Sequence, residues 1–162
     1  MIIFRTRTNA DNPSTSLALL LPLRWLLIER DCEKVIVELT RSVDEGRFDD
    51  ALKLFTEDAV FVRRGQPLTG KSAIAEAFAK RPQNQITRHF LANISVSVED
   101  PNRASAVTSV FVFRHLGTET PPTMPAPISL PDTVEEYRDV LIRDDNDWCI
   151  KHRETKEFFS AQ

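Results

Sequence analysis

The sequence predicts an α+β fold, in which three helices are followed by a curved, mostly antiparallel sheet and lie on one of its faces. Two observations predict it. Apolar residues recur at helical spacing as far as residue 80, and beyond residue 90 they alternate with polar residues over long stretches. The 162 residues, 41% of them hydrophobic and 28% charged, are the size of one globular domain. The chain has no internal repeat and no domain linker.

We expect residues 1–27 to be an extension, with a flexible arm over 1–16 and a short packed segment over 17–27, and the domain to span 28–162. The apolar run within 17–27 is too short to cross a membrane and lacks the flanks of a secretion signal. From residue 28 the spacing predicts a long helix that ends at Gly46. Its apolar stripe comprises Ile28, Cys32, Val35, Ile36, Leu39 and Val43.

Two shorter helices and a strand complete the first half of the chain. The spacing of apolar residues over 48–55 predicts a second helix, whose acidic residues suit its first turn. Residues 59–62 are typical of a short strand, and 65–67 of a turn. A third helix is predicted over 71–80, and Pro82 ends it.

The second half is expected to form four strands. Residues 90–98 and 104–115 predict a pair of strands joined by a turn. Prolines crowd the segment from 121 to 131, so 116–133 is expected to be an irregular loop. Two more strands are predicted over 134–143 and 148–159, with a polar turn between them.

Composition and motifs exclude several classes of function. The net charge of −3 gives no electrostatic reason to expect nucleic acid or a membrane as partner. Cys32 and Cys149 have neither metal-ligand spacing nor a disulfide framework, which suits a reducing compartment, and we expect a cytoplasmic protein. No glycine-rich phosphate loop, nucleophile elbow or metal-ligand cluster is present. Any chemistry is therefore expected to need no cofactor and no metal.

His89 is the sharpest candidate for a catalytic residue. An imidazole titrates near neutral pH, so it can accept a proton and return it elsewhere. Asn93 has the same strand parity as His89, and the hydroxyl of Tyr137 could polarise a carbonyl. A structural role at a strand end is the alternative for His89. Four phenylalanines could face an apolar or cyclic ligand or simply form the core: Phe61, Phe90, Phe111 and Phe113.

The order of these segments resembles the SnoaL-like branch of the nuclear-transport-factor-2-like superfamily over about residues 28–158. The resemblance rests on Asp44 at the end of the long helix, on His89 at the start of a strand, and on the segments 52–61 and 68–71 between them. It implies a cone-shaped α+β barrel with a cystatin-like fold. It also implies that Asp44 and His89 share a pocket and move a proton, as in scytalone dehydratase-like enzymes. A turn-forming role beside Gly46 is the alternative for Asp44.

The resemblance implies a cofactor-free lyase or isomerase that acts on an apolar, cyclic substrate. Asp44 and His89 would be catalytic, and four residues would contact the substrate: Phe61, Asn93, Phe113 and Tyr137. Val43 stands where the dehydratases carry a tyrosine, which favours elimination or isomerisation beside a carbonyl over the same dehydration. The alternative is a non-catalytic ligand-binding or assembly module, similar to the small subunit of ring-hydroxylating dioxygenases. In either case we expect a homodimer through the outer face of the sheet.

Overall fold

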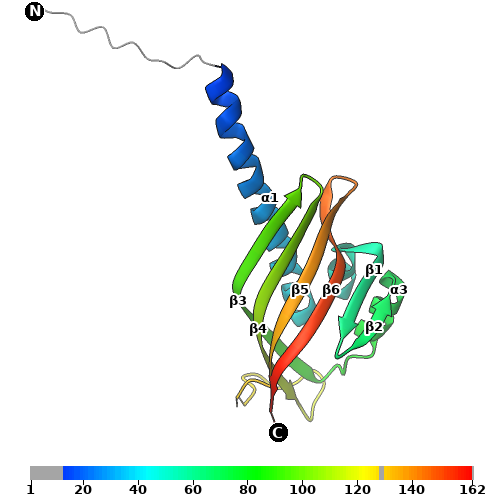
Figure 1. Ribbon diagram of the computed structural model, residues 1–162. Coiled ribbons are helices and arrows are strands. Elements are labelled where there is room, and N and C mark those ends of the chain that lie inside the picture. The colour runs from blue at the N-terminus through cyan, green and yellow to red at the C-terminus, as the bar shows by residue number, and fades with distance from the viewer. Residues whose placement is uncertain (1–12, 128–129, 162) are drawn as a thin grey trace, which may run out of the picture.

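Three helices precede a six-stranded sheet in the computed structural model, which describes residues 13–127 and 130–161, with side chains from residue 22 onward. The helices are α1 (Pro13–Asp44), α2 (Phe48–Lys53) and α3 (Lys71–Ala79). The strands are β1 (Phe55–Arg63), β2 (Gln66–Thr69), β3 (Gln85–Asp100), β4 (Arg103–Leu116), β5 (Thr133–Asp144) and β6 (Asp147–Ser160). The predicted α+β class is confirmed (Figure 1).

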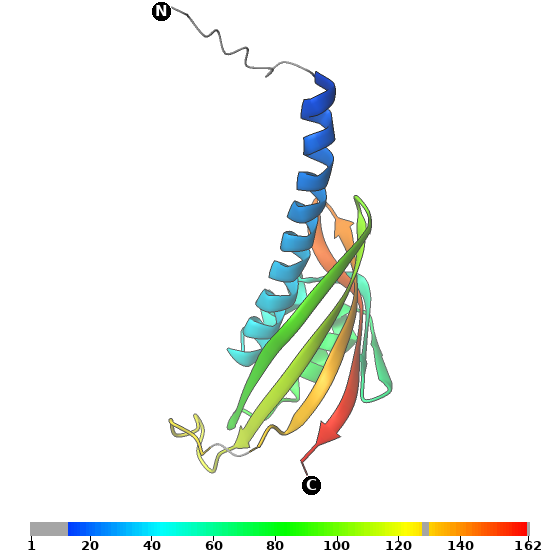
Figure 2. The same cartoon turned by 60° about the vertical axis from the view of Figure 1, so that its left-hand side comes forward.

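The sheet is mixed and strongly curved. Its strand order is β2-β1-β6-β5-β4-β3, with every neighbouring pair antiparallel except β1 and β6, which are parallel. β2 and β3 are the two edges and do not pair, so the sheet is open rather than a closed barrel. α1 lies against the concave face, and Figure 2 shows the strands wrapping past it. The uncovered part of that face is where a cavity can form.

α1 begins earlier than the sequence predicts. It runs without a break from Pro13 across residue 28 to Asp44, so no change of secondary structure marks the expected boundary between extension and domain. Residues 1–12 of the expected arm lie outside the described residues. Trp25 packs against the core, whereas three leucines within two residues of it are exposed: Leu23, Leu26 and Leu27. The first turns of α1 project beyond the sheet (Figure 1).

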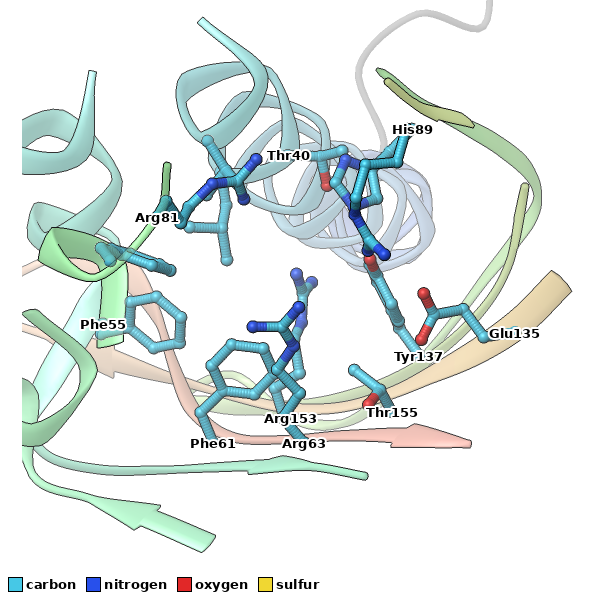
Figure 3. Close-up of a pocket in the computed structure, with 14 residues that line it drawn as sticks. Thr40, Phe55, Phe61, Arg63, Arg81, His89, Glu135, Tyr137, Arg153 and Thr155 are labelled. Carbon is cyan, nitrogen blue, oxygen red and sulfur yellow. The ribbon is translucent and has the colours of Figure 1, made fainter. Parts of the chain in front are cut away.

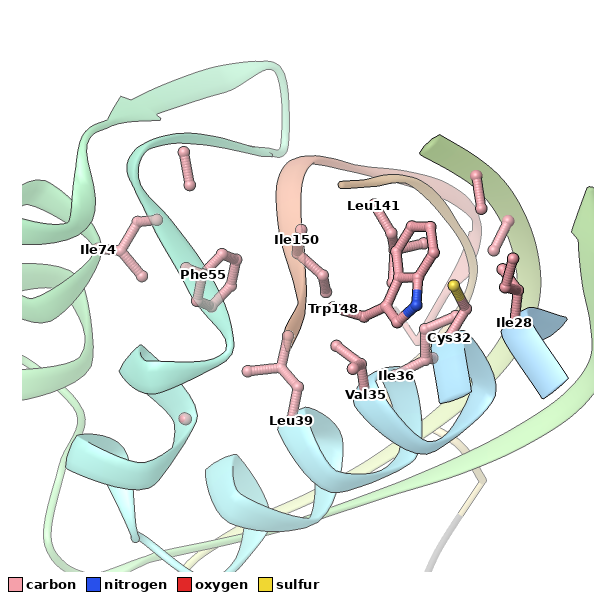
Figure 4. Packing of buried hydrophobic residues seen from close by; sticks show 14 of the residues in the cluster. Ile28, Cys32, Val35, Ile36, Leu39, Phe55, Ile74, Leu141, Trp148 and Ile150 are labelled. Carbon is pink, nitrogen blue, oxygen red and sulfur yellow. The ribbon is translucent and has the colours of Figure 1, made fainter. Parts of the chain in front are cut away.

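The core joins the stripe of α1 to the concave sheet face (Figure 4). Every predicted stripe residue from Ile28 to Leu39 is buried, and Val43 is partly buried. The sheet contributes three large buried residues near the turn between β5 and β6: Leu141, Trp148 and Ile150. α2, α3 and β1 close one side with Ala51, Phe55, Ile74 and Phe78. Removal of this apolar surface from water is the main source of stability.

β2 forms where the sequence predicts only a turn. Its four residues pair with β1, and Pro67 lies opposite Val62. β2 is an edge strand, so the missing N–H of Pro67 removes no hydrogen bond to a further strand. β1 is also longer than predicted, because it begins at Phe55 directly after α2.

β3 contains a bulge that reverses which residues face the core. The pairing with β4 shifts register between Ala92 and Ser95, and Asn93 has a positive φ of 51°. Before the bulge, Leu91 faces inward, and after it Ile94 does. A bulge inserts one extra residue, so the alternation continues on the opposite parity.

The convex face of the sheet carries exposed aromatic side chains. Phe90 is 59% exposed, Phe111 40%, Phe158 52% and Phe159 71%. Phe90 also packs edge-on against Phe113, with ring centroids 5.5 Å apart. None of the helices within the described residues is long and apolar enough to cross a membrane.

A buried ion pair joins the inner faces of β5 and β6. The Arg153 guanidinium donates two hydrogen bonds of 2.7 Å to the two carboxylate oxygens of Asp139. The two side chains are almost fully shielded from water. Burial opposes the charge on Arg153, but the Asp139 carboxylate outweighs that effect and holds the pKa of Arg153 above its ordinary value.

We predict that Asp139→Asn lowers the free energy of unfolding by about 3–5 kcal/mol, since it leaves a buried guanidinium without its counter-charge. Urea unfolding followed by circular dichroism measures the loss. Arg138→Gln is the control, because Arg138 pairs with Glu136 on the exposed side of the same strand. Arg138→Gln should change the free energy of unfolding little. Equal losses in both variants would show that Asp139 is not the required counter-charge of Arg153.

Candidate active site

A cavity opens on the concave face beside the last turns of α1. It encloses about 620 Å³ of space, including the part that opens to solvent at its mouth. Its apolar wall consists of Leu39, Val43, Phe55, Phe61 and Phe78. Its polar wall consists of Thr40, Arg63, Arg81, His89, Arg114, Glu135, Tyr137, Arg153 and Thr155. Figure 3 shows Phe55 and Phe61 on one side of the space and His89, Tyr137 and Glu135 on the other. A concave site that combines apolar side chains with polar and charged groups suits a small molecule that has both kinds of surface.

Asp44 and His89 lie in contact at one side of this cavity. Oδ1 of Asp44 is 2.5 Å from Nδ1 of the His89 ring. Oδ2 of the same carboxylate accepts the backbone N–H of His89 at 2.7 Å. Asp44 is the last residue of α1, and His89 lies near the start of β3. Both side chains are about nine-tenths buried, so solvent does little to loosen the contact.

This geometry selects one tautomer of His89. An ionised carboxylate can only accept hydrogen bonds, so Nδ1 carries the hydrogen and donates it to Asp44. The lone pair then resides on Nε2, for which the described residues supply no hydrogen-bond partner. His89 lines the cavity. Nε2 can therefore act as a base towards a bound molecule, with Asp44 stabilising the imidazolium that forms.

Tyr137 stands beside His89 on the floor of the cavity. The two ring centroids are 6.5 Å apart, and the Arg153 guanidinium lies 4.6 Å from the centroid of the Tyr137 ring. Burial, followed by the charge of Glu135, raises the pKa of Tyr137 well above its usual value. The hydroxyl makes no hydrogen bond to another described residue. It therefore remains a neutral donor that is free to bind a ligand oxygen.

Of the four predicted substrate contacts, two line the cavity and two do not. Phe61 and Tyr137 line the cavity. Asn93 does not, because the bulge in β3 breaks the parity that it was expected to share with His89, and its side chain is exposed. Phe113 does not either, since it packs against Phe90 on the convex face. The expected role of these two residues in binding a ligand in this cavity is therefore corrected.

Four arginines of the cavity wall were missed by the sequence analysis: Arg63, Arg81, Arg114 and Arg153. The alternation of inward and outward residues along a strand could have identified one of them. Arg114 continues the inward positions of Val110 and Val112 along β4, both of which are fully buried. A charged residue at an inward position of a strand indicates either a buried ion pair or a polar cavity. Arg81 gave no such signal, because it lies just after α3 in an irregular segment.

No group of three or more His, Cys, Asp or Glu side chains within residues 13–127 and 130–161 is arranged to hold a metal ion. Cys32 and Cys149 are free thiols and are both buried away from the cavity lining.

Solved structures share the fold of this chain at low sequence identity. An NTF2-like protein with a cystatin-like fold from Novosphingobium aromaticivorans superposes with a TM-score of 0.73 at 21% identity, over 94% of each chain. A provisionally named scytalone dehydratase from the same organism gives a TM-score of 0.70 at 19% identity, over 85% of this chain and 89% of that one. A type 2 hexachlorocyclohexane dehydrochlorinase gives 0.69 at 11% identity, over 86% and 91%. These likenesses establish the fold alone.

None of the curated proteins matches the chain in sequence. A family model does match. The SnoaL-like domain covers residues 24–154, which include α1 from before its core stripe, β1 to β5 and the first part of β6. The match covers Asp44, His89 and every residue that lines the cavity except Thr155. The chain therefore belongs to the SnoaL-like domain family, as its resemblance predicted.

Proposed function

We propose that the protein is a lyase or isomerase that removes a proton from a small molecule bound in the cavity. The observation that carries the proposal is the contact between Asp44 and His89 Nδ1, which leaves Nε2 as the basic atom. Nε2 would take a proton from a carbon beside a carbonyl or beside a leaving group. The proton would return to another carbon in an isomerisation, or leave with the leaving group in an elimination.

Tyr137 would act as the electrophilic partner of His89. Removal of a proton from carbon places negative charge on the adjoining carbonyl oxygen, and a neutral hydroxyl can donate a hydrogen bond to it. The apolar wall with Phe55 and Phe61 fits a cyclic body in the substrate. The dehydrochlorinase and the scytalone dehydratase-like neighbour are named for eliminations, which supports this class of reaction for the shared fold.

The second candidate function is a non-catalytic ligand-binding or assembly module, as in a dioxygenase small subunit. One observation favours it. The Asp44 carboxylate also accepts the backbone N–H of His89, and Arg88 donates to the Asp44 carbonyl oxygen at 2.9 Å. Asp44 therefore ties α1 to β3, which is a sufficient structural reason for an aspartate at this place. Activity measurements on conservative variants separate the two functions.

We predict that His89→Gln lowers kcat by about 10²–10⁴-fold on a substrate found by screening cyclic carbonyl and hydroxy compounds, because positioned general-base catalysis contributes that much. Asp44→Asn should also lower kcat and should change the ring tautomer that ¹⁵N NMR of His89 reports. Asp49→Asn, on the exposed surface of α2, is the control and should match the parent. An Asp44→Asn protein with full activity and an unchanged tautomer would favour the binding module.

We predict a specific pH behaviour for Tyr137. Its pKa is raised, so the hydroxyl stays protonated and kcat should not fall through ionisation of Tyr137 up to at least about pH 10, its ordinary pKa. Tyr137→Phe should lower kcat more than it changes KM, because the hydrogen bond strengthens as charge develops. A pH–rate profile of both proteins tests this. A loss of activity with an apparent pKa below about 10 that is absent from Tyr137→Phe would refute it.

We also propose that two copies associate through the convex face of the sheet. Phe90 and Phe111 form an apolar surface there, which water disfavours. We predict that Phe111→Lys shifts a dimer to monomer in sedimentation analysis, whereas Leu26→Lys on the projecting part of α1 does not. A dimer that survives Phe111→Lys but dissociates in Leu26→Lys would place the interface on α1 instead.

A further inference from the structure

Three arginines lie where the cavity meets a second hollow of the surface. Arg63, Arg81 and Arg114 line both spaces. The second hollow is bounded by the end of α3 and by Pro82 and Gln85, and is open to solvent. Their guanidinium groups are therefore available both to the cavity and to the surface hollow beside it. In Figure 3 Arg63 and Arg81 extend into the space in front of Phe55 and Phe61.

The four cavity arginines differ in how their charges are balanced. Arg153 is neutralised by Asp139 through two hydrogen bonds. Arg114 contacts Asp132 at 2.5 Å. Arg63 and Arg81 form no ion pair with any carboxylate of the described residues. Where the cavity meets the second hollow, two guanidinium groups therefore have no carboxylate of the described residues in direct contact.

Arg81 is held in place without its charge being satisfied. Its one side-chain hydrogen bond goes to the Thr87 hydroxyl at 2.9 Å, and the Phe48 ring lies 5.9 Å from its guanidinium carbon. Burial, with the positive charges of Arg63 and Arg114, lowers the pKa of Arg81. A guanidinium has five N–H donors, so most of those on Arg81 remain for a ligand. Partial burial of a cation with spare donors is costly unless an anion joins it.

We propose that the ligand of this site carries an oxyanion group, a carboxylate or a phosphate, which Arg63 and Arg81 bind at the mouth of the cavity. The planar guanidinium fork matches both of these groups with paired hydrogen bonds. The proposal rests on the proposed function, and it names the substrate class of the same site. The proposed ligand is therefore amphipathic, whereas the sequence led us to expect a purely apolar one.

The positions of the other charges give the ligand a direction. Glu135 lies beside Tyr137 and Thr155, across the cavity from Arg81 (Figure 3). An anionic group is repelled from that end and attracted to the arginines. The apolar body then lies against Phe55 and Phe61, and the opposite end of the molecule faces His89 and Tyr137. The oxyanion thus anchors the substrate, and the proton transfer takes place at a different carbon.

Calorimetric titration of the full chain with three probes of one shape tests the proposal. 2-Naphthoate and 2-naphthyl phosphate carry an oxyanion, and 2-naphthamide is neutral. We expect both anions to bind more tightly than the amide, with the tighter of the two showing which oxyanion the site prefers. Arg81→Gln and Arg63→Gln should each weaken anion binding by about tenfold to a hundredfold, the effect of a lost hydrogen bond to a charged group. They should leave amide binding unchanged, which shows that the cavity is intact.

Arg138→Gln is the matched control, because it removes an equal charge from the opposite face of the sheet. It should leave the preference for the anions as in the parent. The proposal is overturned if the amide binds as tightly as the anions, if the preference survives in both cavity variants, or if none of the three probes binds at millimolar concentration.

The two proposals fail in different ways. His89→Gln removes the proposed base but should keep the preference for the anionic probes, because Arg63 and Arg81, the groups proposed to bind the oxyanion, are unchanged. If the arginine variants lose that preference but no compound is turned over, the anion site stands and the catalytic function falls. If a substrate is found and His89→Gln abolishes its turnover while Arg81→Gln and Arg63→Gln bind every probe like the parent, the anion site falls and the catalytic function stands.

Discussion

The two hydrogen bonds between the Asp44 carboxylate and His89 are the interaction on which the rest of the arrangement depends. They fix the last residue of α1 against the edge strand β3, and the contact of Arg88 with the Asp44 carbonyl satisfies one of the carbonyl groups that every helix end leaves unpaired. The helix stops there, while the strands continue. The concave face beside and beyond this end of the helix forms the cavity, so the carboxylate that holds the end of α1 also lies next to the site.

This division explains why the inner face of one sheet has two kinds of surface. Opposite the helix, β5 and β6 present Leu141 and Ile150, which are fully buried in the core. Beyond the helix end the same strands present Tyr137 and Arg153, which line the cavity. Asp139 lies between the two regions and balances the charge of Arg153, so the polar wall can be built without an unpaired charge in the core. The cavity therefore has a rigid floor made of strands rather than loops, which is what precise positioning requires.

The sequence predicts the elements well because their signals are local. Apolar residues at helical spacing, or alternating with polar residues along a strand, indicate which face of the element is buried. α1 and the four long strands follow those patterns. The site is harder to predict from the sequence, since it depends on contacts between distant segments. Asp44 and His89 are 45 positions apart and only the family resemblance joins them. Asn93 was misplaced because parity assumes an unbroken strand, and the spacing of three between Leu91 and Ile94 was the one local sign of the bulge. Strand parity could mark Arg114 as inward, but that Arg63, Arg114 and Arg153 meet depends on sheet pairing, and Arg81 joins them from the segment after α3.

The charges around the cavity favour the chemistry that its base would begin. When a proton leaves carbon, negative charge appears on the substrate, and its stability depends on the groups already fixed around it. The hydroxyl of Tyr137 is one such group, because it can donate a hydrogen bond to a developing oxyanion, whereas Glu135 opposes negative charge there. The mouth arginines act on a different part of the ligand, where a permanent charge can be held. A binding module needs only the second of these features, whereas proton transfer needs the first, and residues suited to each line this one cavity.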